Sequence, residues 1–140
     1  MAHTHQLAVI AYVIRNGRFL LLRRNNEPAV WGPPGGRLEP DEDPNKGILR
    51  EVKEETGLDV AIMTPVGVWH GSYRDSILVS IDYLAENTSG EVKLSNEHSE
   101  FRWSSIEDLR NHNPKLGDTK TSFLLKDFEK AWELYQKLKA

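Results

Sequence analysis

The sequence predicts an α/β fold of the α+β type, with a central mixed β-sheet flanked by helices on both faces. Two hydrophobic periods predict it: residues 79–83 alternate like a half-buried strand, and residues 123–138 repeat apolar side chains along one helical stripe. Chain size is the third observation. The 140 residues, 39% of them hydrophobic, suffice for one core, so we expect a single domain over residues 1–140.

A β-hairpin is expected near the start of the chain. Leu7–Ile14 is almost wholly apolar and β-prone, and the apolar run resumes over Phe19–Leu22. Between the two runs, Asn16-Gly17 supplies the positive-φ residues of a tight turn. The next segment, residues 25–40, contains four prolines and three glycines, which predict a shaped loop without regular elements.

The loop leads into the helix with the strongest local signals, Pro44–Thr56. Asp43 is a good N-cap, and Pro44 fits the first helical position because its missing N–H costs nothing there. Gly57 suits the left-handed residue that ends a helix. The sequence therefore fixes both ends of this helix by local chemistry.

The second half of the chain predicts shorter elements. After the strand at 79–83, residues 101–103 predict another short strand, and Ser104 or Ser105 is expected to cap a short helix that ends at Arg110. The final helix, 123–138, should pack its stripe into the core. That stripe comprises Leu124, Leu125, Phe128, Trp132, Tyr135 and Leu138.

Composition excludes several classes of function. The chain has no cysteine, which removes disulfides, thiolate nucleophiles and Cys-ligated zinc. A net charge of −3 gives no field that would hold a polymeric nucleic acid. No apolar run reaches the roughly 18 residues of a membrane span, and the first six residues lack the features of a signal peptide, so a cytoplasmic protein is expected.

Three glutamates carry the chemistry that the sequence suggests. On a helix, Glu51, Glu54 and Glu55 fall at i, i+3 and i+4 and project from one face, where their like charges repel. A hard divalent cation would offset that repulsion, and Mg²⁺ favours a few carboxylates with waters and phosphate oxygens. The alternative is a solvated helix face balanced by Arg50 and Lys53. The Pro34-Gly35-Gly36 loop favours the cation, since it lets backbone approach the carboxylates.

The segment from Gly36 to Leu58 resembles the Nudix box, Gly-x5-Glu-x7-Arg-Glu-U-x-Glu-Glu-x-Gly-U with U aliphatic, and matches it at every defined position. The lead-in Trp31-Gly-Pro-Pro-Gly-Gly resembles the loop that precedes the box in the MutT-like branch. The resemblance implies an α/β/α Nudix sandwich, in agreement with the fold predicted from the periodicities.

The resemblance also implies a set of metal ligands for Mg²⁺, with Mn²⁺ as a substitute. Glu54 and Glu55 would be the principal ligands, the carbonyl of Gly35 would join them, and Glu51 would ligate metal or position the attacking water. Metal-activated water would attack a phosphorus of a P–O–P linkage, while the cations neutralise charge on the phosphates.

Other box positions would support this site. By the same resemblance, Arg50 would take part in catalysis by orienting the glutamates. Glu42 would hold the loop and the helix start, and Gly36 and Gly57 would be structural positions of the box.

A fourth glutamate is a candidate outside the box. In many MutT-like members, a loop glutamate several residues before a Trp-bearing strand reaches the metal centre, and Glu97 fits that place better than Glu100. The resemblance implies a ligand or general base at Glu97, and an ordinary loop carboxylate is the alternative. His98 is expected to be structural.

Cations and aromatics near the box are candidates for binding substrate. One of Arg23 and Arg24, at the end of the second strand, is expected to contact phosphate, and the other would be a solvated edge charge; Arg37 is a third candidate. Aromatic side chains could stack on a base or belong to the core. The three in question are Trp31, Trp69 and Tyr73.

The expected substrate is a small nucleotide, and a nucleoside triphosphate, oxidised ones among them, is favoured over the alternatives. An ADP-ribose hydrolase is disfavoured because Pro65 lies closer behind the box than the proline of that branch, and Tyr73 alone weakly suggests a dinucleoside polyphosphate. A domain that binds nucleotide or a partner without hydrolysis, and a mainly structural subunit, are rival readings that the intact box disfavours. A homodimer is left open.

Overall fold

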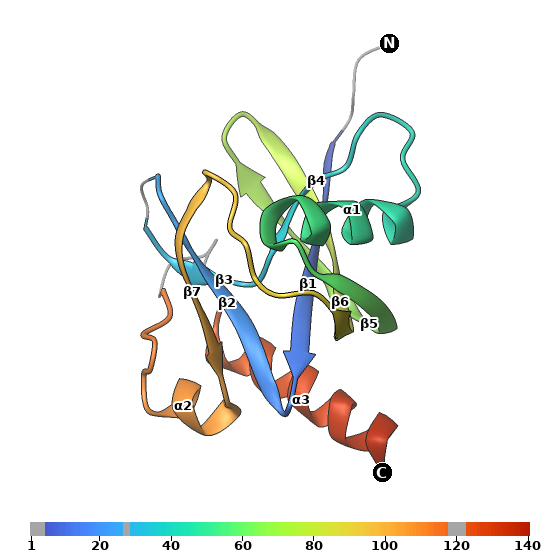
Figure 1. The fold of residues 1–140 in the computed structure, drawn as a ribbon. Helices are drawn as coiled ribbons and strands as arrows, with labels where there is room; N and C mark the ends of the chain where they lie inside the picture. The colour runs from blue at the N-terminus through green and yellow to red at the C-terminus, as the bar shows by residue number, and fades with distance from the viewer. Residues whose placement is uncertain (1–4, 27–28, 118–122) are drawn as a thin grey trace.

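The computed structural model describes residues 5–26, 29–117 and 123–140, so residues 27–28 of the expected loop lie outside it. Figure 1 shows a sheet in the order β3-β2-β1-β6-β5, with β4 also pairing with β1 and β7 with β2. β1 and β6 are parallel and the other pairs antiparallel, so the sheet is mixed as expected. The strands are β1 Gln6–Arg15, β2 Arg18–Arg24, β3 Trp31–Gly32, β4 Gly35–Arg37, β5 Asp59–Tyr73, β6 Ser76–Ser89 and β7 His98–Ser104.

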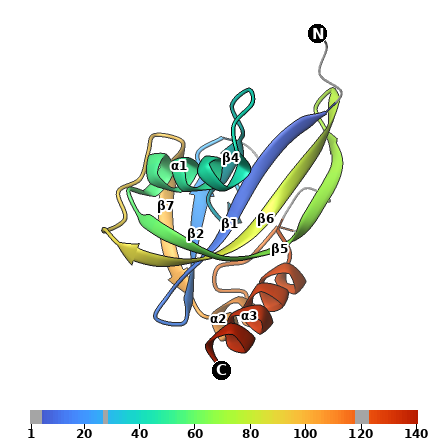
Figure 2. The ribbon, with the colours of Figure 1, turned by 90° about the vertical axis from the view of Figure 1, so that its right-hand side faces the viewer.

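Helices cover both faces of the sheet, which confirms the predicted sandwich (Figure 2). They are α1 Pro44–Thr56, α2 Ile106–Arg110 and α3 Leu125–Lys139. Successive residues of β1 point to opposite faces, since strand side chains alternate. Val9 packs in the cluster with Ile48 and Val52 of α1, whereas Tyr12 packs with Phe128 of α3.

The locally predicted turns and caps are confirmed. Asn16 and Gly17 have φ of 52° and 74° in the β1–β2 turn. The Asp43 carboxylate accepts from the N–H groups of Asn45 (2.8 Å) and Lys46 (3.4 Å), and Gly57 ends α1 at φ 76°. These groups fix α1 at the predicted residues.

The two C-terminal helices agree with the prediction except at the ends of the last one. Ser105 caps α2. The last helix begins at Leu125, and Leu138 is 51% exposed, so the apolar stripe does not extend to its end. No helix in the described residues is long and apolar enough to cross a membrane.

Two sheet features differ from the prediction. The expected loop over residues 25–40 contains two short strands, β3 paired with β2 and β4 paired with β1. In β4, Gly35 has no Cβ and so lies directly against the backbone of β1 at Val9. The strand expected at 79–83 is part of the longer β6. It pairs with β5, a strand that was not predicted. β5 contains Pro65 and several register shifts, which obscure its alternation.

Candidate active site

Arg50 of α1 joins three of the box glutamates. Its Nε and Nη2 donate to the two oxygens of Glu42 at 2.7 and 2.8 Å, and its Nη1 donates to Glu51 at 3.0 Å and Glu54 at 3.1 Å. The Arg50 hydrogen bonds hold the pKa of the Glu42 carboxyl at about 2. The two-pronged bond fixes the guanidinium plane, so Arg50 orients the acidic face of the helix.

Glu55 lies on the other side of this network and is buried, with 4% of its surface exposed. Its Oε1 accepts from the N–H of Gly35 at 3.2 Å. Burial, together with the negative charge of Glu51, raises the pKa of Glu55 to about 9. A buried carboxyl of this kind needs a proton or a cation to be stable.

Gly35 turns its own peptide groups toward this carboxylate. The Pro34 carbonyl accepts from Ala11 N–H, and Leu38 N–H donates to the Leu7 carbonyl, so these neighbours face β1. Because hydrogen-bonding groups alternate along an antiparallel strand, Gly35 directs both its N–H and its C=O away from β1. The carbonyl expected as a metal ligand therefore lies at the edge that Glu55 approaches.

The turn at residues 96–97 and the start of β7 bring Glu97 and His98 to Glu55. The N–H of Asn25 donates to the Glu97 carbonyl at 3.0 Å, and the N–H of Ser95 donates to the Glu55 carbonyl at 3.2 Å, which ties the turn to β2 and α1. One ligand atom from each of Glu55, Glu97 and His98 lies within 4.8 Å of the others. We call these three residues the Glu55 cluster.

The other two box glutamates lie beside this cluster. The Glu51 carboxylate rests on Gly36, where a Cβ would come within 2.5 Å of its Oε2, and burial raises its pKa. The Glu54 side chain is 59% exposed and lies outside the Glu55 cluster. The three carboxylates on one helical face thus differ in burial: Glu55 is buried, Glu51 is half-buried and Glu54 is exposed.

Two cavities meet at the Glu55 cluster. The first, of about 470 Å³, has a mainly apolar wall that includes Ile10, Tyr12 and Trp69. The second, of about 400 Å³, is lined mostly by polar side chains, among them Asn26 and Arg74. Both are lined by Arg24, Gly35, Gly36, Arg37, Tyr73, Glu97 and His98.

The family model described as NUDIX domain matches residues 4–125. The chain belongs to this family. A MutT-like protein of Streptomyces ambofaciens is 33% identical over 106 residues, covering 75% of this chain and 67% of that protein. The ADP-ribose pyrophosphatase of Methanocaldococcus jannaschii is 30% identical over 114 residues, covering 79% of this chain and 65% of that protein.

Further similarities agree with the Nudix assignment. The asymmetrical bis(5'-nucleosyl)-tetraphosphatase of Mus musculus is 33% identical over 99 residues, covering 64% of this chain and 65% of that protein. The crystal structure of the MutT protein of Methanosarcina mazei Go1 is 29% identical with a TM-score of 0.73, covering 98% of this chain and 96% of that one. The chain spans about two thirds of the length of the three curated relatives. The predicted family, fold and enzyme class, a hydrolase of phosphoric anhydride bonds, are confirmed at family level.

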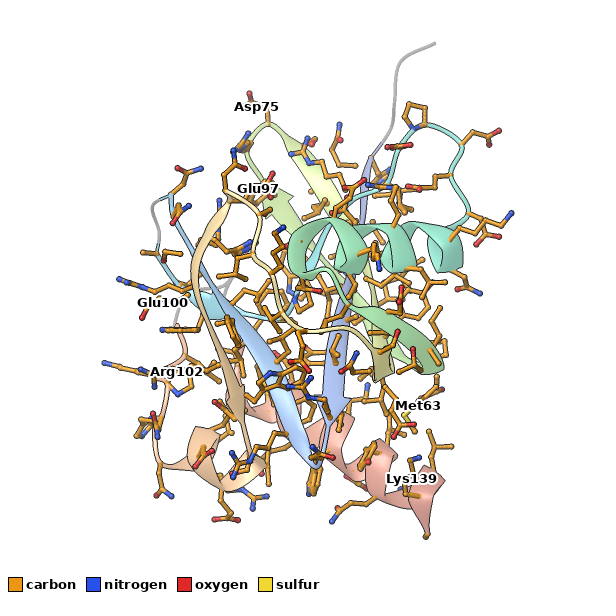
Figure 3. All side chains as sticks on the ribbon, in the orientation of Figure 1. Met63, Asp75, Glu97, Glu100, Arg102 and Lys139 are labelled. Atoms are coloured by element: carbon orange, nitrogen blue, oxygen red, sulfur yellow. The ribbon has the colours of Figure 1, made fainter. Side chains whose placement is uncertain are left out.

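The three candidate arginines differ in whether they line the two cavities. Arg24 pairs with His98 across the β2–β7 ladder and lines both cavities, as does Arg37. Arg23 lies on the opposite face, where its Nη1 donates to Glu100 at 3.2 Å, and it lines neither cavity. Figure 3 shows Glu97 near the hairpin tip labelled at Asp75, whereas Glu100 extends from the outer side of β7.

The three aromatic candidates also differ in whether they line a cavity. Trp69 and Tyr73 line the first cavity. Trp31 lines neither cavity; the guanidinium of Arg102 lies over its ring, 5.2 Å from the centroid. Of the three aromatic candidates, Trp69 and Tyr73 therefore line a cavity and Trp31 does not.

Sequence reasoning missed Arg74, which the turn between β5 and β6 brings to the second cavity. The guanidinium carbons of Arg37 and Arg74 lie 5.8 and 5.4 Å from the centroid of the Tyr73 ring. Arg74 has a φ of 57°. Its position at the cavity follows from the β5–β6 pairing, so no local motif could have revealed it.

A polar group within the largely apolar first cavity was missed as well. Asp82, Asp127 and Lys130 come from β6 and α3. Ser80 Oγ donates to Asp82 Oδ1 at 2.7 Å, and burial raises the pKa of Asp82 to about 6. No local sequence signal joins these residues, because Asp82 meets Asp127 and Lys130 only when α3 packs on the sheet.

Proposed function

We propose that this Nudix protein is a Mg²⁺-dependent pyrophosphohydrolase that converts a nucleoside triphosphate, oxidised ones among the candidates, to the monophosphate and pyrophosphate. The main support for this proposal is that the Glu55 cluster lies where an apolar cavity meets an arginine-lined cavity. A nucleoside fits the apolar cavity, with Trp69 and Tyr73 available for stacking. The phosphate chain fits the polar cavity, where Arg24, Arg37 and Arg74 offset its charge.

The donor set of the Glu55 cluster fits a divalent cation. Glu55 is buried without a lysine or arginine partner among the described residues, and its carboxylate lies beside Glu97 and His98. Carboxylate and backbone carbonyl oxygens suit Mg²⁺, and Mn²⁺ would substitute for it. When bound, the cation would neutralise phosphate charge and make the phosphorus more susceptible to attack by water.

The side chains around the cluster supply the remaining functions. Glu51 and Glu97 both line the polar cavity, so either carboxylate can accept a proton from the attacking water. Arg50 keeps Glu51 in place through its 3.0 Å hydrogen bond. Arg24 and Arg37 line both cavities, so they would hold the phosphates on each side of the bond that breaks.

A dinucleoside polyphosphate is the second candidate substrate. Tyr73 lines both cavities, which offers a stacking surface for a second nucleoside, and a tetraphosphatase of that type is among the relatives. One relative is named ADP-ribose pyrophosphatase, so this compound belongs in the same comparison. Its second half is a sugar phosphate, which would use fewer of the arginines in the polar cavity.

A screen that resolves products tests the proposal. Nucleoside triphosphates, a dinucleoside tetraphosphate and ADP-ribose are incubated with protein and Mg²⁺, with excess chelator as control. We expect monophosphate and pyrophosphate from a triphosphate, no turnover with chelator, and recovery when Mg²⁺ is restored. Undiminished hydrolysis in chelator would refute the metal requirement, and binding of every nucleotide without turnover would favour a non-hydrolytic domain.

A further inference from the structure

His98 has an unusual environment at the start of β7. Its side chain is 12% exposed, and Nδ1 is the one buried side-chain nitrogen or oxygen that has no hydrogen-bond partner in the described residues. An unpaired polar atom that is shielded from water is unfavourable, and native proteins rarely retain one without a reason. The structure therefore leaves a nitrogen at the Glu55 cluster with no assigned interaction.

The distances around this nitrogen do not suit a direct hydrogen bond. Nδ1 lies 3.6 Å from Glu55 Oε2, which is too long for a well-formed N–H···O contact. The other oxygen of Glu55 already accepts from Gly35 N–H. Nδ1 and Oε2 thus face each other without being joined.

The same distances do suit two ligands of one cation. Metal–nitrogen and metal–oxygen bonds of about 2.0–2.3 Å place the ligand atoms of one ion roughly 3 to 4.5 Å apart. The 3.6 Å separation falls within that range, and one ligand atom from each of Glu55, Glu97 and His98 lies within 4.8 Å of the other two.

We infer that His98 Nδ1 binds the divalent cation directly, beside carboxylate oxygens of Glu55 and Glu97. This inference rests on the proposed metal dependence and replaces the structural role that the sequence suggested for His98. An imidazole nitrogen strengthens binding of transition-metal ions far more than that of Mg²⁺, which prefers oxygen ligands. The site then accepts Mg²⁺ but has an additional preference for Mn²⁺.

Pulsed electron paramagnetic resonance of the Mn²⁺-loaded protein tests the direct bond without measuring turnover. A coordinated nitrogen modulates the spin echo of Mn²⁺, so we expect a directly bonded ¹⁴N signal in the wild type. His98→Gln should lose the signal, and His70→Gln should keep it, because His70 is exposed on β5 and lines neither cavity.

Calorimetric titration with each metal alone gives the second readout. His98→Gln should weaken Mn²⁺ binding at least about 10-fold and Mg²⁺ binding much less. His98→Asp, which returns an oxygen ligand, should recover Mn²⁺ binding in part while the nitrogen signal remains absent. Circular dichroism establishes that each variant is folded, and the aspartate variant serves if the glutamine variant is not.

Two results would overturn the inference. Bound Mn²⁺ without a nitrogen signal in the wild type would leave His98 as a neighbour that orients Glu55, with the proposed hydrolase function intact. No Mn²⁺ or Mg²⁺ binding in the wild type would refute this inference and the proposed metal site together.

Discussion

Glu97 and Glu100 are three residues apart, yet their carboxylates have different surroundings. Glu97 belongs to the Glu55 cluster, whereas Glu100 accepts from Arg23 on the outer face of β7. Glu97→Gln should therefore lower kcat at least about 100-fold, the lower end of the range for loss of a general base, while Glu100→Gln stays near the wild type. The measurement is kcat for both variants at saturating nucleotide.

Varying Mg²⁺ in that experiment identifies the role of Glu97. Activity that returns at high Mg²⁺ indicates a lost ligand, and activity that stays low at every concentration indicates a lost base. Equal and small effects in both variants would remove Glu97 from the site. Thermal stability should change little in either case, since both side chains are exposed.

Arg74 offers a second test at the level of one residue. If it binds the phosphate chain from the polar cavity, Arg74→Gln should raise KM about 10-fold with little change in kcat, because uniform binding energy is lost. Arg102→Gln is a matched control: Arg102 also lies over an aromatic ring, but lines neither cavity. An equal rise in KM for both variants would indicate a general charge effect.

At the scale of elements, α1 depends on its N-cap. The Asp43 carboxylate accepts from two N–H groups that have no partner within the helix. Asp43→Ala should destabilise the protein by about 1 kcal/mol in urea unfolding, and Asp43→Asn should retain most of the stability, since asparagine caps equally well. If alanine and asparagine behaved alike, the cap would not contribute.

Local chemistry explains which elements the sequence could predict. Asp43, Pro44 and Gly57 define α1 through interactions within a few residues, so its ends were predicted correctly. β5 has no such signals. Its course is determined by pairing with β6, across register shifts and Pro65, which a single sequence does not reveal.

The candidate site shows the same division. Helical spacing predicts that Glu51, Glu54 and Glu55 share a face, but it cannot tell which one is buried. That depends on Gly35, which reaches Glu55 only because β4 pairs with β1. Whether Glu54 ligates metal, as the resemblance implies, remains a prediction, and its exposed position makes Glu54→Gln an informative comparison with Glu55→Gln.

At the scale of the whole molecule, Glu55 should make stability depend on pH. Burial raises its pKa from 4.5 to about 9, so the metal-free folded protein holds a proton that the unfolded chain releases. The resulting stability is fully present below pH 4.5 and is lost as the pH rises toward 9. The half-buried Glu51, whose pKa is also raised, acts in the same direction.

Measurements from pH 6.5 to 9 exclude two other groups with shifted pKa values. The pKa of His98 is lowered from 6.5 and that of Asp82 is raised only to about 6, so both titrate at lower pH. In chelator, the wild-type melting temperature should fall across the range, and that of Glu55→Gln should fall less, with Glu51 as the remaining contribution. A wild-type melting temperature that does not change would contradict the raised pKa of Glu55.

If the proposed cation binds at Glu55, the buried carboxyl would make metal loading an ion exchange. At neutral pH the cation would displace the proton that occupies the carboxyl, so binding should release roughly one proton per site. The heat of binding should therefore vary with the ionisation enthalpy of the buffer in wild type, and much less in Glu55→Gln. Acidification of the surroundings would favour the proton, unload the metal and turn hydrolysis off while the fold, stabilised by the same proton, persists.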